Sequence, residues 1–200
     1  MSDIFHGRVC CISDNTHYIN GIESICSLLS VDFIPIKIDE NQILKLTPST
    51  EFYLKMKSST ILDIIIICIK NIHCRHFIIS SKYMQNKKLI IESQLPLSME
   101  FLDTFPFVLA KSPSTDKIIH VLLKSFYLPN RMRMYDVKYV DFVNDICSEV
   151  SAYKLSKEYE VSEKTINQRK RSILKEFGVE RLNIVGIYLC RDIMNMRKYN

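Results

Sequence analysis

The 200-residue sequence predicts an α/β domain with a doubly wound parallel sheet, followed by a smaller all-helical domain. Three observations support this prediction. Short β-rich runs alternate with helical patterns five times along the first two-thirds of the chain. The last third has helical patterns only. Positive charge is concentrated there: residues 128–200 hold 14 Lys and Arg against 10 Asp and Glu. Their net charge is +4, and the net charge of the whole chain is +5.

Five apolar runs are typical of strands and are expected at residues 8–13, 31–38, 61–69, 88–93 and 105–112. The third run, ILDIIIICI, is apolar on both faces, as a central parallel strand should be. Pro35 lies in the second run and cannot donate a hydrogen bond to a neighbouring strand, so that strand is expected at an edge of the sheet.

Helical patterns lie between and after these runs. Residues 18–29 place Ile22, Ile25, Cys26 and Leu29 on one face. Residues 115–126 form a second helix, whose inward residues are expected to be Ile118, Ile119, Leu122 and Leu123. Residues 41–59 form a poorly patterned third helix. We expect the first domain at residues 1–127, a short basic linker at 128–136 and the second domain at 137–200.

Four helices are predicted in the second domain, at residues 137–149, 152–158, 163–177 and 182–194. The third of them carries one apolar stripe, formed by Ile166, Ile173, Leu174 and Phe177. Ser162 is expected to be its N-cap and Gly178 its C-cap. The short turn YEVS joins it to the preceding helix. Two short helices joined in this way predict a helix-turn-helix, whose second helix can enter a DNA major groove.

The run SAYKLSKEYEVSEKTINQRKRSILKEFGV resembles the DNA-binding domain of LuxR-type (NarL/FixJ) regulators. The segment VSEKTI…ILKEFGV carries most of the resemblance, which covers about the last 65 residues. It implies that Asn167, Gln168 and Arg171 face base edges, and that four further residues lie nearer phosphates: Lys164, Thr165, Arg169 and Lys170. Lys175 completes the basic face that we expect to bind double-stranded DNA.

The order of strands and helices before the linker resembles the receiver domain of bacterial response regulators. By this resemblance Asp14, Cys68, Ser93 and Lys111 occupy the phosphoacceptor pocket. Cys68 stands where the family has its phosphoacceptor Asp, and a thiol cannot form an acyl phosphate or hold Mg²⁺ in place of a carboxylate. We therefore expect a degenerate receiver that is not phosphorylated. A buried salt bridge between Asp14 and Lys111 is an equally good explanation of these two residues.

Several classes of function have little support in the sequence. The seven cysteines are scattered, and reduced, buried thiols are expected. In HCRH (73–76), His73 and His76 share a helix face but Cys74 does not, which makes a poor metal cage. The longest apolar run is too short to cross a bilayer, and the chain does not open with a signal peptide. No glycine loop or nucleophile elbow indicates an enzyme. We expect no metal, no cofactor and a cytoplasmic location.

Together these patterns predict a sequence-specific, DNA-binding transcriptional regulator that acts without phosphorylation. It is expected to act as a homodimer, or as a heterodimer with a related regulator, through its receiver-like domain. The alternative is a pseudo-receiver interaction module, which modulates a partner regulator and binds little DNA itself.

Overall fold

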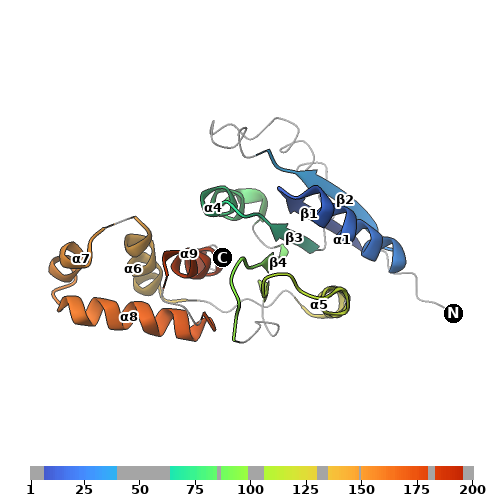
Figure 1. The fold of residues 1–200 in the computed structure, drawn as a ribbon. Coiled ribbons are helices and arrows are strands. Elements are labelled where there is room, and N and C mark those ends of the chain that lie inside the picture. Colours follow the sequence, from blue (N-terminus) through green and yellow to red (C-terminus); the bar gives the residue numbers. More distant parts are fainter. Residues whose placement is uncertain are drawn as a thin grey trace.

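The computed structural model describes residues 7–39, 64–84, 87–98, 106–129, 135–148, 150–179 and 183–195. They form two regions that lie side by side (Figure 1). One is a five-stranded parallel sheet with helices on its two faces, and the other is a group of helices formed by residues 137–195. The fold class predicted from the sequence is confirmed.

The sheet has the strand order β2-β1-β3-β4-β5, and all neighbouring strands are parallel. The strands are β1 (Arg8–Ser13), β2 (Asp32–Lys37), β3 (Ile64–Cys68), β4 (Lys88–Glu92) and β5 (Phe107–Leu109). Every residue of β3 is buried, and β2 is an edge strand in which Pro35 lies opposite Cys11. Both predictions about strand position are therefore confirmed. The order is that of doubly wound folds, which place their functional residues at the carboxyl edge of the sheet.

One face of the sheet is covered by α1 (Thr16–Leu28) and α5 (Thr115–Tyr127). The inward face of α5 differs in part from the sequence prediction. Ile118, Val121 and Leu122 are buried, whereas Ile119 and Leu123 are only half-buried. The reason is helical spacing: each residue turns by about 100°, so Ser125 completes the buried face and the other two lie at its edges.

The other face of the sheet packs against α4 (Ile72–Ile79), which is followed by the short 3₁₀ helix η1 (Lys82–Met84). The core on this side continues without a break into the C-terminal helices. Those helices are α6 (Val137–Cys147), α7 (Ala152–Glu158), α8 (Glu163–Glu176) and α9 (Ile184–Asn195). Figure 1 shows α9 as the member of this group next to α4. All four predicted helices of the last third are present, with ends shifted by one or two residues.

The connection that leaves β4 makes a second contact between the two regions. Residues 93–98, the first described part of the connection between β4 and β5, contain no helix. Leu97 instead forms an antiparallel bridge with Val179. The backbone N–H and the hydroxyl of Ser98 both donate to the carbonyl of Gly178, at 2.8 and 3.0 Å. The end of α8 is thereby attached to the sheet region.

Several parts of the sequence prediction lie outside the described residues. They are the helical pattern at 41–59, the start of the third strand at 61–63, residues 130–134 of the linker, and the single terminal residues 105, 149 and 182 of a predicted strand and two predicted helices. Within the described ranges, no helix is long and apolar enough to cross a membrane.

Candidate nucleic-acid interface

A helix-turn-helix is formed by α7, the turn at residues 159–162 and α8. Leu155 on α7 and Ile166 and Ile173 on α8 are fully buried against one another and against the rest of the helical group. In the turn, Glu160 adopts a left-handed conformation with φ of 52°. The N–H of Val161 then donates to the carbonyl of Ser156 at 2.9 Å. This geometry sets the direction in which α8 leaves the turn.

Ser162 is the N-cap of α8, as the sequence predicts, whereas the C-cap is Phe177 and the predicted Gly178 follows it. The hydroxyl of Ser162 accepts a hydrogen bond from the N–H of Thr165 at 3.1 Å, which satisfies one of the free donors of the first turn. After the helix, Gly178 has φ of 63°, a conformation that glycine adopts without the steric cost of a side chain. Thr165 also places its hydroxyl 2.9 Å from that of Ser162. Its side chain is therefore part of the cap.

Five of the eight predicted DNA-binding residues lie on one exposed face of α8. The first is Lys164, and the other four follow it at spacings of three, four, seven and eleven residues. These spacings place all five side chains within one sector of the helix surface. None of their side chains makes a hydrogen bond or ion pair with another described residue. They are Lys164, Asn167, Gln168, Arg171 and Lys175.

The other basic residues of α8 have a different position. Arg169 is exposed, but its guanidinium lies over the ring of Phe142 on α6, 5.6 Å from the ring centroid. Lys170 is half-buried on the side of Ile166 and Ile173, near the buried thiol of Cys147. The helical spacing 166, 170, 173 already places Lys170 in the apolar stripe. The exposed basic face of α8 is therefore narrower than predicted from the sequence, because Arg169 and Lys170 lie beside it and not on it.

The helices around α8 are fixed by polar and aromatic contacts. Tyr159 packs edge-on against Phe142, with ring centroids 5.1 Å apart, and donates its phenol hydrogen to the carboxylate of Asp145. Tyr139 on α6 donates to Glu176 near the end of α8 at 3.0 Å. Burial, followed by the neighbouring carboxylate, raises the pKa of both phenols, so both remain protonated donors at neutral pH. The bond to Glu176 holds the end of α8 against α6, and the contacts of Tyr159 hold the turn that precedes α8 against the same helix.

A second candidate site lies at the carboxyl edge of the sheet, where a pocket of about 650 Å³ opens. Asp14, Cys68 and Lys111 line this pocket, as the resemblance to receiver domains implied. Ser93 does not line it: its side chain is buried, and its hydroxyl accepts from the N–H of Leu95. Glu92, the last residue of β4, lines the pocket.

The chemistry of this pocket differs from that of a phosphoacceptor site. Burial, and then the charge of Glu92, raises the pKa of the Cys68 thiol, which is therefore a neutral group at physiological pH. The predicted buried salt bridge between Asp14 and Lys111 is not formed, because Lys111 is exposed and Asp14 accepts instead from the backbone N–H of Lys70 at 2.9 Å. Among the described residues, no group of His, Cys, Asp and Glu side chains is arranged to hold a metal ion.

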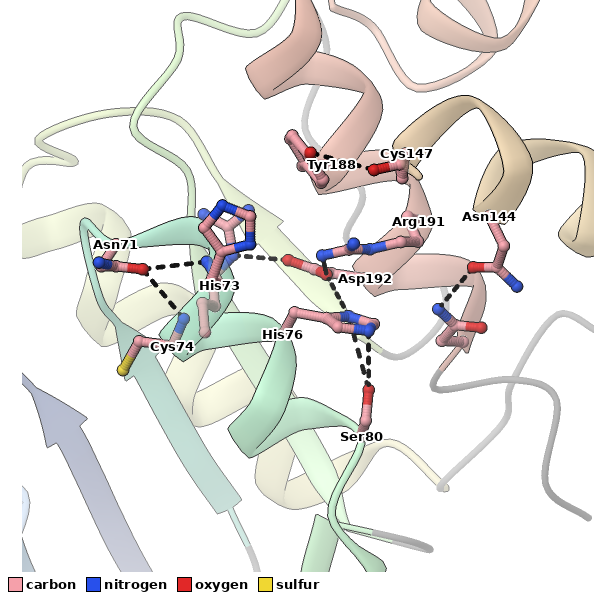
Figure 2. Close-up of polar contacts among 12 residues, drawn as sticks. Asn71, His73, Cys74, His76, Ser80, Asn144, Cys147, Tyr188, Arg191 and Asp192 are labelled. Atoms are coloured by element: carbon pink, nitrogen blue, oxygen red, sulfur yellow. Dashed lines mark hydrogen bonds and ion pairs between the residues drawn. The ribbon is translucent and has the colours of Figure 1, made fainter. Parts of the chain in front are cut away.

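The HCRH segment forms part of a buried polar cluster between α4 and α9 (Figure 2). Asp192 of α9 is fully buried and accepts from the Nε of Arg75 at 2.8 Å. Nδ1 of His76 lies 2.9 Å from the same carboxylate, and Nη2 of Arg191 lies 3.3 Å from it. Cys74 is buried, like all seven cysteines, which are free thiols as predicted. Asp192 was not predicted from the sequence, although the charged pair Arg191 and Asp192 inside the apolar run IVGIYLCRDIM was a signal for it.

Comparison with known proteins finds similarity at the level of solved structures only. No protein-family model and no curated protein matches the sequence. The two-component response regulator RcsB in complex with DNA is 14% identical, with a TM-score of 0.46 over 93% of this chain and 98% of that one. RcsB from Salmonella enterica serovar Typhimurium bound to promoter rprA is 14% identical, with a TM-score of 0.43 over 90% and 98%. FixJ from B. japonicum is 9% identical, with a TM-score of 0.36 over 93% and 97%. At these identities the similarity is one of fold.

Proposed function

We propose that this protein is a sequence-specific, DNA-binding transcriptional regulator that uses α8 as its recognition helix. The observation that carries the proposal is the outward face of α8: three cationic and two amide side chains, all exposed, on a helix whose opposite side buries Ile166, Ile173 and Leu174. A B-DNA major groove is about 12 Å wide, and an α-helix with its side chains is about 10–12 Å across. Such a helix therefore fits the groove with this face directed toward the bases.

The position of each side chain suggests its role. Asn167, Gln168 and Arg171 lie near the middle of the face, where amides can pair with adenine and a guanidinium with guanine. Lys164 and Lys175 lie toward the two ends, where the phosphate backbones cross the helix. Lys164 is in the first turn of α8, where the helix dipole disfavours a cation. A phosphate at this position would offset that cost.

Arg169 and Lys170 have weaker support as DNA contacts. The stacking of Arg169 on Phe142 and the half-burial of Lys170 give both side chains a role inside the helical group. They remain proposed phosphate contacts at the border of the face, because both are long enough to turn outward. Thr165 is proposed to contact a phosphate while it serves in the cap.

The proposal extends to assembly and control. We infer a dimer, formed with a second copy or with a related regulator, because two-fold symmetric proteins bind two half-sites. We also infer that phosphorylation of an aspartate does not control the protein. Cys68 ends β3 as a neutral thiol, and the pocket lacks a carboxylate at that position. As a DNA-binding regulator without a membrane span in its described part, it is proposed to act in the cytoplasm.

A binding experiment tests the recognition helix. A duplex selected from random sequence by the full-length protein is titrated by fluorescence anisotropy at several salt concentrations. Arg171→Ala is expected to cost about 1–3 kcal/mol and to relax the preference at one base pair. Lys164→Ala should weaken all sequences alike and reduce the slope of log K against log salt by about 1.

The control is Lys37→Ala, which removes an exposed cation from β2, the edge strand far from α8 in Figure 1. It should leave affinity, specificity and salt slope unchanged. Equal effects of all three substitutions would show that binding depends on net charge and not on α8. If the full-length protein selects no duplex but copurifies with another regulator, the interaction-module alternative is the better description.

A further inference from the structure

The pocket at the carboxyl edge of the sheet contains buried polar atoms without partners. Glu92 is 5% exposed, and its Oε2 has no hydrogen-bond partner. Oδ1 of Asp14 and the hydroxyl of Tyr18 are also buried and unpartnered. All three residues line the same pocket. Buried polar atoms in native proteins nearly always have partners, so three orphans around one pocket indicate a missing one.

The carboxylate of Glu92 is held in place by the loop after β5. Its Oε1 accepts from the backbone N–H of Ser112 at 3.2 Å. Ser112 has a left-handed backbone, with φ of 53°, which is costly for a residue other than glycine. This conformation brings its N–H to the carboxylate. One oxygen of Glu92 is therefore fixed by the protein, and the other remains available to the pocket.

The charges and walls of the pocket indicate what the partner would be. Two acidic side chains, Asp14 and Glu92, supply the unpartnered carboxylate oxygens, whereas the two lysines of the lining, Lys70 and Lys111, are exposed. A buried carboxylate oxygen that lacks a hydrogen-bond donor is unfavourable, and a positively charged donor forms the strongest hydrogen bond with it. The remaining wall combines polar side chains, such as those of Asn15 and Gln94, with an apolar part that includes the buried side chains of Ile22, Ile25 and Ile118. A pocket of about 650 Å³ has the size of a small-molecule site.

We infer that this pocket binds a small organic cation, an amine or amidine with an apolar body, whose N–H groups donate to Glu92 and Asp14. The apolar body would lie against the isoleucines of α1 and α5, which border the pocket. Tyr18 can accept from the same group or from a bridging water. A metal ion is a poor fit, because no cluster of three suitable ligands occurs among the described residues. The inference does not depend on the DNA-binding function.

The test is a titration of the full-length protein, followed by ¹H–¹⁵N NMR and by thermal unfolding. The probes are phenethylamine, benzamidine and isoamylamine, each compared with a neutral analogue: 2-phenylethanol, benzamide and isoamyl alcohol. At least one cation is expected to shift the resonances around Glu92 and to raise the unfolding temperature, whereas its neutral analogue should bind at least ten-fold more weakly.

Variants locate the binding group. Glu92→Gln should weaken binding of that cation about ten-fold or more, because it removes a charge-assisted hydrogen bond. The matched control is Glu23→Gln, which removes the same charge from an exposed position on α1 and should have no effect. Tyr18→Phe keeps the carboxylate and is expected to weaken binding about three-fold, so it serves if Glu92→Gln does not fold.

Three results would overturn the inference. One is the absence of binding by any of the three cations, which would mean that water alone satisfies the orphan oxygens. Another is equal affinity for a cation and its neutral analogue, which would indicate apolar association only. The third is that binding weakens equally in the Glu92→Gln and Glu23→Gln variants.

Discussion

The buried carboxylate of Asp192 gives the most quantitative prediction about stability. Its side chain is fully buried, and its main partner, Arg75, is 1% exposed. Asp192→Ala leaves the guanidinium of Arg75 without its charge partner, and Nη2 of that group already has no acceptor. Removal of one member of a buried ion pair typically costs about 3–5 kcal/mol. We therefore expect a loss of about 4 kcal/mol.

The assay is urea unfolding followed by circular dichroism. With an m-value of about 2–3 kcal/mol per molar urea, a loss of 4 kcal/mol lowers the midpoint by about 1.3–2 M. The control is Asp116→Ala, an exposed acid in the first turn of α5, for which a loss below about 1 kcal/mol is expected.

A double substitution distinguishes a buried charge from a general packing defect. Arg75→Met together with Asp192→Leu removes both charges and keeps apolar volume in place. It should recover about 2 kcal/mol or more of the loss, because apolar replacements of buried ion pairs are often neutral or stabilising. If Asp192→Ala lowers the midpoint no more than Asp116→Ala does, the α4–α9 cluster contributes no net stability and the reasoning is refuted.

Three further predictions concern α8, a thiol and the pocket. Ser162→Ala should destabilise the protein by about 0.5–2 kcal/mol in thermal unfolding because the cap of α8 is lost, whereas Ser162→Thr should lose much less; equal losses would contradict the capping role. Burial raises the pKa of Cys147 to about 12 from its usual value of 9, so the folded state holds this proton more tightly and stability falls as the pH rises above about 9. At pH 10 the loss from this one group is about 1.4 kcal/mol, and Cys147→Ala, compared by urea unfolding at pH 7 and pH 10, should show a smaller decrease than the wild type. Incubation with acetyl phosphate and Mg²⁺ should give no phosphoryl adduct in the intact mass, and an adduct on Asp14 or Glu92 would show that the pocket is still a phosphoacceptor site.

Much of the fold was predictable because the decisive signals are local. Pro35 excludes a central position in the sheet, and the unbroken apolar run of β3 requires one. Ser162 and Gly178 mark the ends of α8 because capping depends on neighbouring backbone groups.

The parts that were missed depend on contacts between distant segments. Glu92 lies at the end of an apolar strand, and Asp192 forms a charged pair with Arg191 inside an apolar helix. Their partners Ser112 and Arg75 are remote in sequence. Nothing near Arg75 in the sequence indicates that it meets a residue 117 positions away. The half-burial of Lys170 is different, because the helical spacing of Ile166, Lys170 and Ile173 already indicates it, although the sequence prediction placed Lys170 near phosphates.

In the proposed complex, the exposed face of α8 lies against duplex DNA. Lysine acetylation footprinting tests this arrangement, with the protein labelled alone and in complex with a selected duplex. Lys164 and Lys175 are expected to become protected in the complex, whereas Lys37 on the sheet should react at an unchanged rate. Unchanged reactivity of both α8 lysines, in a sample that still retains the DNA, would contradict it.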